Sequence, residues 1–133
     1  MLRINDKEVE ITKSTIKFAN AIYNKVKGYT PSIDISFINN DKAGYISFFL
    51  DFYLNNSFDN IINKTFKSNP MNFEPISVIE IFDTINFYDN IDSDVTVTLG
   101  EIKNNKIDFK LIIDDSLIKI EYDGVLDIDY IKK

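Results

Sequence analysis

The chain of 133 residues contains no cysteine, no histidine and no tryptophan. Without cysteine it can form no disulfide bond and can offer no thiolate to a metal, which suits a reducing compartment. The lack of histidine removes the commonest general acid or base near neutral pH and the commonest ligand of transition metals. Catalysis would have to rely on carboxylates, tyrosine, lysine and hydroxyl groups. We therefore expect a protein that is not an enzyme and that needs neither a metal nor a cofactor.

Long apolar runs are missing as well, because no stretch reaches the roughly eighteen apolar residues of a membrane span. Residues 1–6 lack the order of positive, apolar and small residues that is typical of a secretory signal. These absences predict a soluble cytoplasmic protein with no membrane partner. The length predicts a single domain, residues 1–133, that buries roughly two thirds of its unfolded surface around one core.

The net charge of −6 is unevenly distributed along the chain. Residues 1–79 hold eight acidic and nine basic residues, whereas residues 80–133 hold thirteen acidic and six basic residues. A surface of that sign disfavours nucleic acid and favours a basic partner. Solubility alone is the alternative explanation for the acidic excess.

The last forty residues contain four short alternating runs: 95–102, 107–113, 118–122 and 125–131. Strands joined by such short segments must pair antiparallel, because a parallel pair needs a crossover of about a dozen residues or more. The C-terminal region is therefore predicted to be a four-stranded meander.

The apolar pattern also predicts the loops of this meander, because residues opposite one another share a face. A bulge near Gly100 keeps Leu99, Val97 and Val95 on the core face, and the first hairpin joins Ile102 to Ile107. A four-residue loop spans 114–117, and a three-residue loop spans 122–124 with Gly124 left-handed. The pairs predicted across these two loops are Ile113 with Ile118, Leu111 with Ile120, Lys110 with Glu121, Ile120 with Leu126, Ile118 with Ile128 and Lys119 with Asp127.

In the chain before this meander, segments with the apolar spacing of strands alternate with segments with the apolar spacing of helices. Strands are predicted on either side of 5–7, at 33–37 and at 45–54, the last pair joined by a turn at 39–44, although 45–54 is also compatible with a helix. Apolar residues spaced by three and four predict a helix at 13–27 that ends at Gly28. Helices are also predicted at 58–66 and 76–88, the last on a capping-box spacing between Ser77 and Glu80 despite many β-branched residues. The predicted fold class is α+β, an antiparallel sheet with two or three helices on one face.

Several candidate sites are weighed against structural explanations. Asn90, Asp92, Asp94 and Glu101 have the spacing of a calcium loop, but the required glycine is Val95, and a strand start explains them better. Asp127 and Asp129 share a strand face, where solvated carboxylates keep ordinary acidity. An aromatic run could line a pocket or fill the core: Tyr45, Phe48, Phe49, Phe52 and Tyr53.

Three functions remain: an inhibitor of a basic protein, a small ligand-binding or accessory domain with an aromatic pocket, and an enzyme, which we rank last. In size, acidity and its AT-rich codon composition, the chain resembles bacterial immunity proteins that neutralise toxins of the contact-dependent growth inhibition type. That resemblance implies occlusion of a basic toxin domain, most simply a nuclease, by an acidic sheet face. The predicted contacts are Asp108, Asp114, Asp115, Glu121, Asp127 and Asp129, with Tyr122 and Tyr130 as anchors.

Overall fold

A computed structural model describes residues 1–23, 26–50, 62–68, 76–82, 87–89 and 94–129. This part of the chain is all-β and contains no helix, so the prediction of an α+β fold is wrong. It also has no helix long and apolar enough to cross a membrane. The strands are β1 (Leu2–Ile4), β2 (Lys7–Tyr23), β3 (Val26–Asn39), β4 (Lys42–Leu50), β5 (Lys64–Ser68), β6 (Ile76–Phe82), β7 (Phe87–Asp89), β8 (Asp94–Lys103), β9 (Lys106–Asp114) and β10 (Lys119–Asp129).

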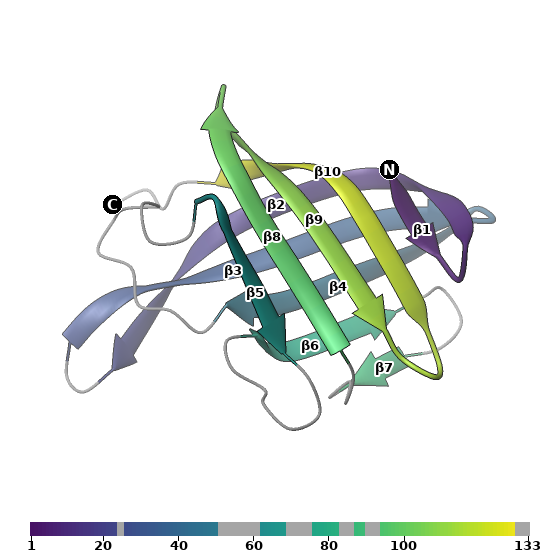
Figure 1. Cartoon of the computed structure of the whole chain (residues 1–133), viewed down its shortest axis with the longest axis horizontal. Helices are drawn as coiled ribbons and strands as arrows, with labels where there is room; N and C mark the ends of the chain where they lie inside the picture. Colours follow the sequence, from purple (N-terminus) through teal and green to yellow (C-terminus); the bar gives the residue numbers. More distant parts are fainter. Residues whose placement is uncertain (24–25, 51–61, 69–75, 83–86, 90–93, 130–133) are drawn as a thin grey trace.

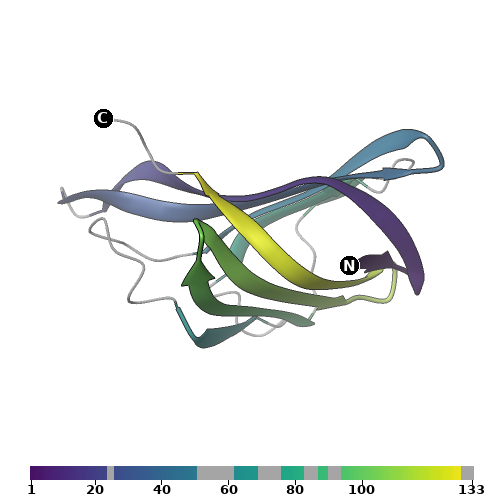
Figure 2. The same ribbon diagram turned by 90° about the horizontal axis from the view of Figure 1, so that it is seen from above.

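One curled sheet joins these ten strands in the order β5-β8-β9-β10-β1-β2-β3-β4-β6-β7. The strands β8, β9 and β10 cross over β2, β3 and β4, so the sheet forms a half-barrel (Figure 1). β10 passes from one layer to the other (Figure 2). Through Ile120 to Tyr122 it pairs antiparallel with β1, and through Asp127 to Asp129 it pairs parallel with β2. β10 therefore makes the corner at which the sheet folds over itself.

The core lies between the two layers, because alternate residues of each strand point inward. β9 alternates strictly between exposed and buried positions, and β4 and β8 alternate over most of their length. Phe48 of β4 and Phe109 of β9 stack across the core with ring centroids 6.4 Å apart. Aliphatic side chains from both layers surround this pair, so the two layers share a single core.

Three tight turns are made by residues with positive φ, and none of them uses glycine. Asn5 and Asp6, Asn40 and Asp41, and Asn104 and Asn105 all have φ between 51° and 66°. Two successive left-handed residues match the twist of the flanking strands, and Asn and Asp tolerate this conformation best after glycine. The predicted turns at 5–7 and 39–44 are confirmed, as is the pairing of Ile102 with Ile107.

The helix predicted at 13–27 is wrong, because its described residues, 13–23 and 26–27, belong to the long hairpin of β2 and β3. The two strands pair without interruption from Lys13 opposite Ser36 to Tyr23 opposite Val26. This pairing satisfies the backbone along its whole length and overrides the local spacing of the apolar residues. Gly28 therefore lies in a strand and ends no helix.

The two later helices are also contradicted where the structure describes them. Residues 64–66, placed in the second helix, belong to β5, while residues 58–61 lie outside the described part. Residues 76–82 and 87–88 of the third helix belong to β6 and β7. β6 pairs with β4 and β7 pairs with β6, which accounts for the many β-branched residues of this segment.

The predicted loop at 122–124 does not exist, because residues 119–129 form one continuous strand, β10. The Tyr122 side chain turns back over Gly124, where an added Cβ would lie 3.1 Å from the tyrosine oxygen. Gly124 is therefore needed for space beneath the ring, and among the described residues no glycine has positive φ. The pairs predicted across that loop, among them Lys119 with Asp127, are accordingly wrong.

The middle loop has the predicted length, but it lies one residue further along the chain. Asp114 pairs with Lys119 and Ile113 with Ile120, so the loop comprises residues 115–118. The register differs from the prediction by two residues, which preserves the division between inner and outer faces. In β8 the predicted irregularity near Gly100 is confirmed as a register shift between Leu99 and Ile102.

Candidate binding faces of the sheet

Most of the predicted contact residues gather on the outer face of β9 and β10. Exposed or half-buried carboxylates on this face are Asp108, Asp114, Glu121, Asp127 and Asp129. Asp115 lies in the following turn, where its Oδ1 accepts a hydrogen bond of 2.8 Å from the Leu117 amide. Tyr122 points to the inner face and is only 5% exposed, whereas Tyr130 lies outside the described residues.

Cations interrupt this acidic face more often than the sequence suggested. Lys106 Nζ lies 2.8 Å from Asp127 Oδ1, and the two residues are register partners on β9 and β10. Lys110 is opposite Asp123, and Arg3 of β1 is opposite Glu121. The face therefore carries alternating positive and negative side chains, with a modest excess of acidic ones.

Lys119 is the cation of this face that lies near two carboxylates. Its Nζ lies 3.4 Å from Glu121 Oε1 and 3.7 Å from Asp6 Oδ1. The hydrogen bond to Glu121 raises the pKa of Lys119 above its ordinary value, and the charge of Asp6 adds to this effect. The ammonium group is thus fully charged throughout the physiological range.

Two carboxylates of this face differ in their register partners. Asp108 is opposite the aliphatic Val125, whereas Asp114 of β9 lies between Asp94 of β8 and Lys119 of β10, whose pKa the Asp114 charge helps to raise. Like charges directly opposite on a sheet are destabilising, which makes this corner favourable for an approaching cation.

Aliphatic side chains are exposed among these charges. Ile112 of β9 is 49% exposed and Val125 of β10 is 38% exposed, although both lie in regular strands. Beside Ile112 is a shallow hollow of about 280 Å³ that Met1, Arg3 and Glu121 help to line. Apolar groups within a charged surround are the usual composition of a protein interface.

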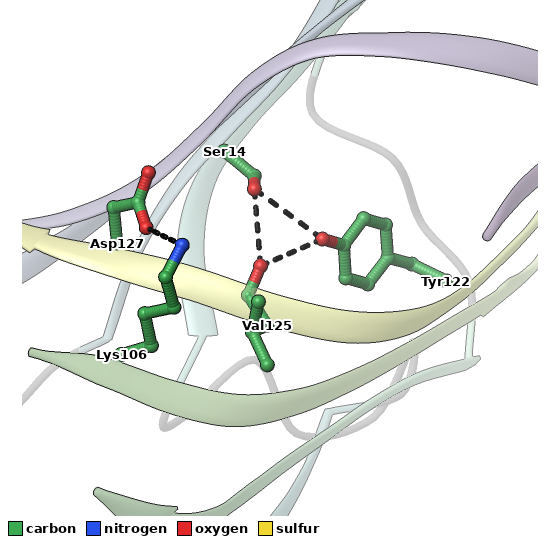
Figure 3. A network of polar contacts seen from close by, with 5 residues as sticks. All are labelled: Ser14, Lys106, Tyr122, Val125 and Asp127. Carbon is green, nitrogen blue, oxygen red and sulfur yellow. Dashed lines mark hydrogen bonds and ion pairs between the residues drawn. The ribbon is translucent and has the colours of Figure 1, made fainter. Parts of the chain in front are cut away.

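Tyr122 helps to hold β10 against β2 instead of facing solvent (Figure 3). Its hydroxyl donates to the Val125 carbonyl oxygen at 2.8 Å, and the Ser14 hydroxyl donates to the same oxygen at 3.0 Å. The two hydroxyl oxygens lie 3.3 Å apart. The ring also packs against Phe109 at a centroid distance of 5.4 Å. Tyr122 therefore holds β10 in position from the inner side of the sheet.

The predicted aromatic pocket is divided between the two faces of β4. Phe48 is buried in the core, Phe49 is half-buried on the opposite face, and the Tyr45 ring lies on that opposite face beside Phe82. Phe52 and Tyr53 lie outside the described residues. The inward aromatic side chain thus fills the core.

The possible calcium loop is described only in part. Asp94 and Glu101 lie in the single strand β8, and Asn90 and Asp92 are outside the described residues. No group of acidic side chains within the described ranges is arranged to hold a metal ion.

A second polar surface lies on the outer face of β2, β3, β4 and β6. It contains a hollow of about 450 Å³ whose lining includes Lys13, Thr15, Asp34 and Glu80. This surface was not predicted, because the helices expected at 13–27 and 76–88 separate residues that the sheet brings together. The alternation of polar residues at 13, 15 and 17 is the signal that could have indicated it.

The comparisons with protein families, with curated proteins and with solved structures found no match to this chain.

Proposed function

We propose that this chain is a non-catalytic inhibitor of the immunity type that binds a basic protein, most simply a nuclease toxin, through the outer face of β9 and β10. The observation that carries the proposal is the exposure of Ile112 and Val125 on the same face as the carboxylates of Asp108 and Asp114. Apolar side chains provide binding free energy at the centre of an interface, and carboxylates guide a basic partner to it.

The alternation of positive and negative side chains indicates which carboxylates would contact the partner. Asp127 is already paired with Lys106 at 2.8 Å, so its charge is partly compensated within the protein. Asp108 is opposite the uncharged Val125, and Asp114, although it is opposite Lys119, also has the like charge of Asp94 on its other side, so both carboxylates favour an added cation. We therefore place the centre of the contact on these two carboxylates and on the two aliphatic side chains between the strands.

The inner side of the sheet supports this role, because its contacts hold β9 and β10 in place. Tyr122 and Ser14 fix the Val125 carbonyl, and Phe109 packs beneath the same part of β10. A face that is ordered before binding loses little conformational entropy on association. This preorganisation suits an inhibitor that must bind tightly.

The test begins with the neighbouring genes, because an immunity protein is encoded beside its toxin. The partner to be tested is the basic C-terminal domain encoded by the adjoining reading frame. We expect binding that weakens steeply with added salt and that falls roughly a hundredfold in the double variant Asp108→Lys with Asp114→Lys. Ile112→Ala should weaken binding by about tenfold.

The matched control reverses the same number of charges elsewhere on the surface. Glu8→Lys with Glu10→Lys changes two exposed carboxylates of β2 and alters the net charge equally. The control should retain nearly full affinity after correction for net charge. Equal losses in both double variants, or the absence of any adjoining basic domain, would contradict the proposal.

A further inference from the structure

The hollow on the outer face of β2, β3, β4 and β6 is lined by a row of polar side chains that crosses four strands. Thr15 of β2 is opposite Asp34 of β3, Asp34 is opposite Ser47 of β4, and Ser47 is opposite Glu80 of β6. These strands are neighbours in the sheet, so the row spans three interstrand spacings, roughly 14 Å. Its volume of about 450 Å³ is in the range of sites for small molecules.

Thr15 is the feature that distinguishes this hollow from ordinary polar surface. Its side chain is only 6% exposed, yet its hydroxyl has no hydrogen-bond partner among the described residues. In the same part of the chain, no fully buried side-chain oxygen or nitrogen lacks a partner. The Thr15 hydroxyl therefore opens into the hollow. Water can satisfy the hydroxyl there, and a ligand that displaces this water has to replace its hydrogen bond.

Charges of both signs surround Thr15. Lys13 and Lys17 flank it on β2, and Asp34 and Glu80 lie across the hollow on β3 and β6. On the other side of β2, Asp127 of β10 is opposite Thr15 and Asp129 is opposite Lys17. Asp34 Oδ1 accepts a hydrogen bond of 2.9 Å from the Ser47 hydroxyl, which leaves its second oxygen free to accept another. The hollow thus offers strong hydrogen-bond donors on β2 and strong acceptors on β3 and β6, and a ligand that both donates and accepts can pair with the two sets at once.

Tyr45 adds an apolar surface to this polar lining. It is 37% exposed, lines the hollow, and its ring centroid lies 6.1 Å from that of Phe82. An aromatic ring fixed beside hydrogen-bonding groups presents a flat apolar surface to a ligand that is polar at its edges.

We propose that this hollow, lined by Lys13, Thr15, Asp34, Glu80 and Tyr45, binds a neutral polyhydroxylated ligand, a saccharide of one or two rings. Each sugar hydroxyl both donates and accepts, so it can pair with the ammonium groups and with the carboxylates. The C–H face of a sugar ring is apolar and matches Tyr45. This site adjoins the outer face of β10, where Asp127 is opposite Thr15, but its lining comes from β2, β3, β4 and β6, so the proposal does not depend on the interface proposed above.

The experiment titrates the full chain with cellobiose, maltose, lactose and N,N′-diacetylchitobiose, monitored by amide shifts in ¹H–¹⁵N NMR spectra. We expect at least one of these disaccharides to shift amides of β2, β3, β4 and β6 in a saturable way at millimolar concentrations. Thr15→Val and Glu80→Gln preserve side-chain shape, and each should weaken that binding by about tenfold, the effect of one or two hydrogen bonds. The same spectra report whether each variant is folded.

Glu121→Gln is the matched control, because it makes the same chemical change on the outer face of β10. It should leave saccharide affinity unchanged. The proposal is overturned if none of the four disaccharides gives saturable shifts, or if the shifts persist undiminished in both Thr15→Val and Glu80→Gln.

Discussion

The two outer faces of the half-barrel differ in how far their polar side chains bond to one another. On β9 and β10, cations and carboxylates alternate across strands, and Lys106 and Asp127 approach to 2.8 Å. On β2, β3, β4 and β6, Ser47 donates a hydrogen bond to Asp34, but the Thr15 hydroxyl on the β2 side of the hollow has no partner among the described residues. The first face is largely satisfied by its own neighbours, whereas the second keeps hydrogen-bonding capacity available.

This difference implies two modes of recognition on one scaffold. A partner of the β9 and β10 face must compete with existing ion pairs, so apolar contact with Ile112 and Val125 would provide most of the binding free energy. A ligand in the hollow would gain from hydrogen bonds that the fold leaves unmade. Both faces are backed by the same core, so variants of that core test whether the two faces fold as one unit.

The largest effect is expected from truncating the aromatic pair that joins the two layers. Phe48→Ala, beneath the hollow, and Phe109→Ala, beneath the acidic face, should each lower the free energy of unfolding by about 3–5 kcal/mol. Because the rings stack at 6.4 Å, the double variant should lose about 1 kcal/mol less than the sum of the two. Urea denaturation measures all three. Additive losses, or a transition that splits into two, would show that each face has a core of its own.

A smaller effect is expected at two inward-facing glycines, one beneath each face. A Cβ at Gly44 would lie 2.5 Å from the Phe37 ring and 2.6 Å from the Phe82 carbonyl oxygen, so the backbone itself obstructs it. Gly44→Ala should lower the free energy of unfolding by about 1–3 kcal/mol. Gly124→Ala, whose Cβ meets the Tyr122 oxygen at 3.1 Å, should cost less because that side chain can move. An equal or reversed order of the two midpoints in urea would contradict this account.

These glycines also show why part of the fold could be predicted and part could not. Turn chemistry is local, so the hairpin that joins Ile102 to Ile107 and the bulge near Gly100 were predicted from the sequence. Asp123-Gly124 carries an equally strong local turn signal, but a tyrosine two residues earlier occupies the space above the glycine. That packing depends on Phe109 in another strand and is invisible in the local pattern.

The same limit explains the missed second face. Ile16, Ala19, Ile22 and Val26 have helical spacing, but β2 forms a long hairpin with β3 and also pairs with β10, a strand that is distant in sequence. Alternation in β9 is strict, so its outer carboxylates were identified correctly without the structure. The candidate site was thus predictable where one strand carries it and unpredictable where four strands assemble it.

The smallest effect is expected inside the hollow, where two hydroxyl groups of the same lining should respond oppositely. The Ser47 hydroxyl donates to Asp34 at 2.9 Å, so Ser47→Ala should lower the free energy of unfolding by about 1 kcal/mol. The Thr15 hydroxyl has no such partner within the described chain, so Thr15→Val should leave the free energy of unfolding unchanged or raise it by up to about 1 kcal/mol. Thermal and urea unfolding of the two variants measure the contrast. A loss in Thr15→Val as large as that in Ser47→Ala would mean that the Thr15 hydroxyl serves the fold, and the distinction between a satisfied face and an open one would no longer hold.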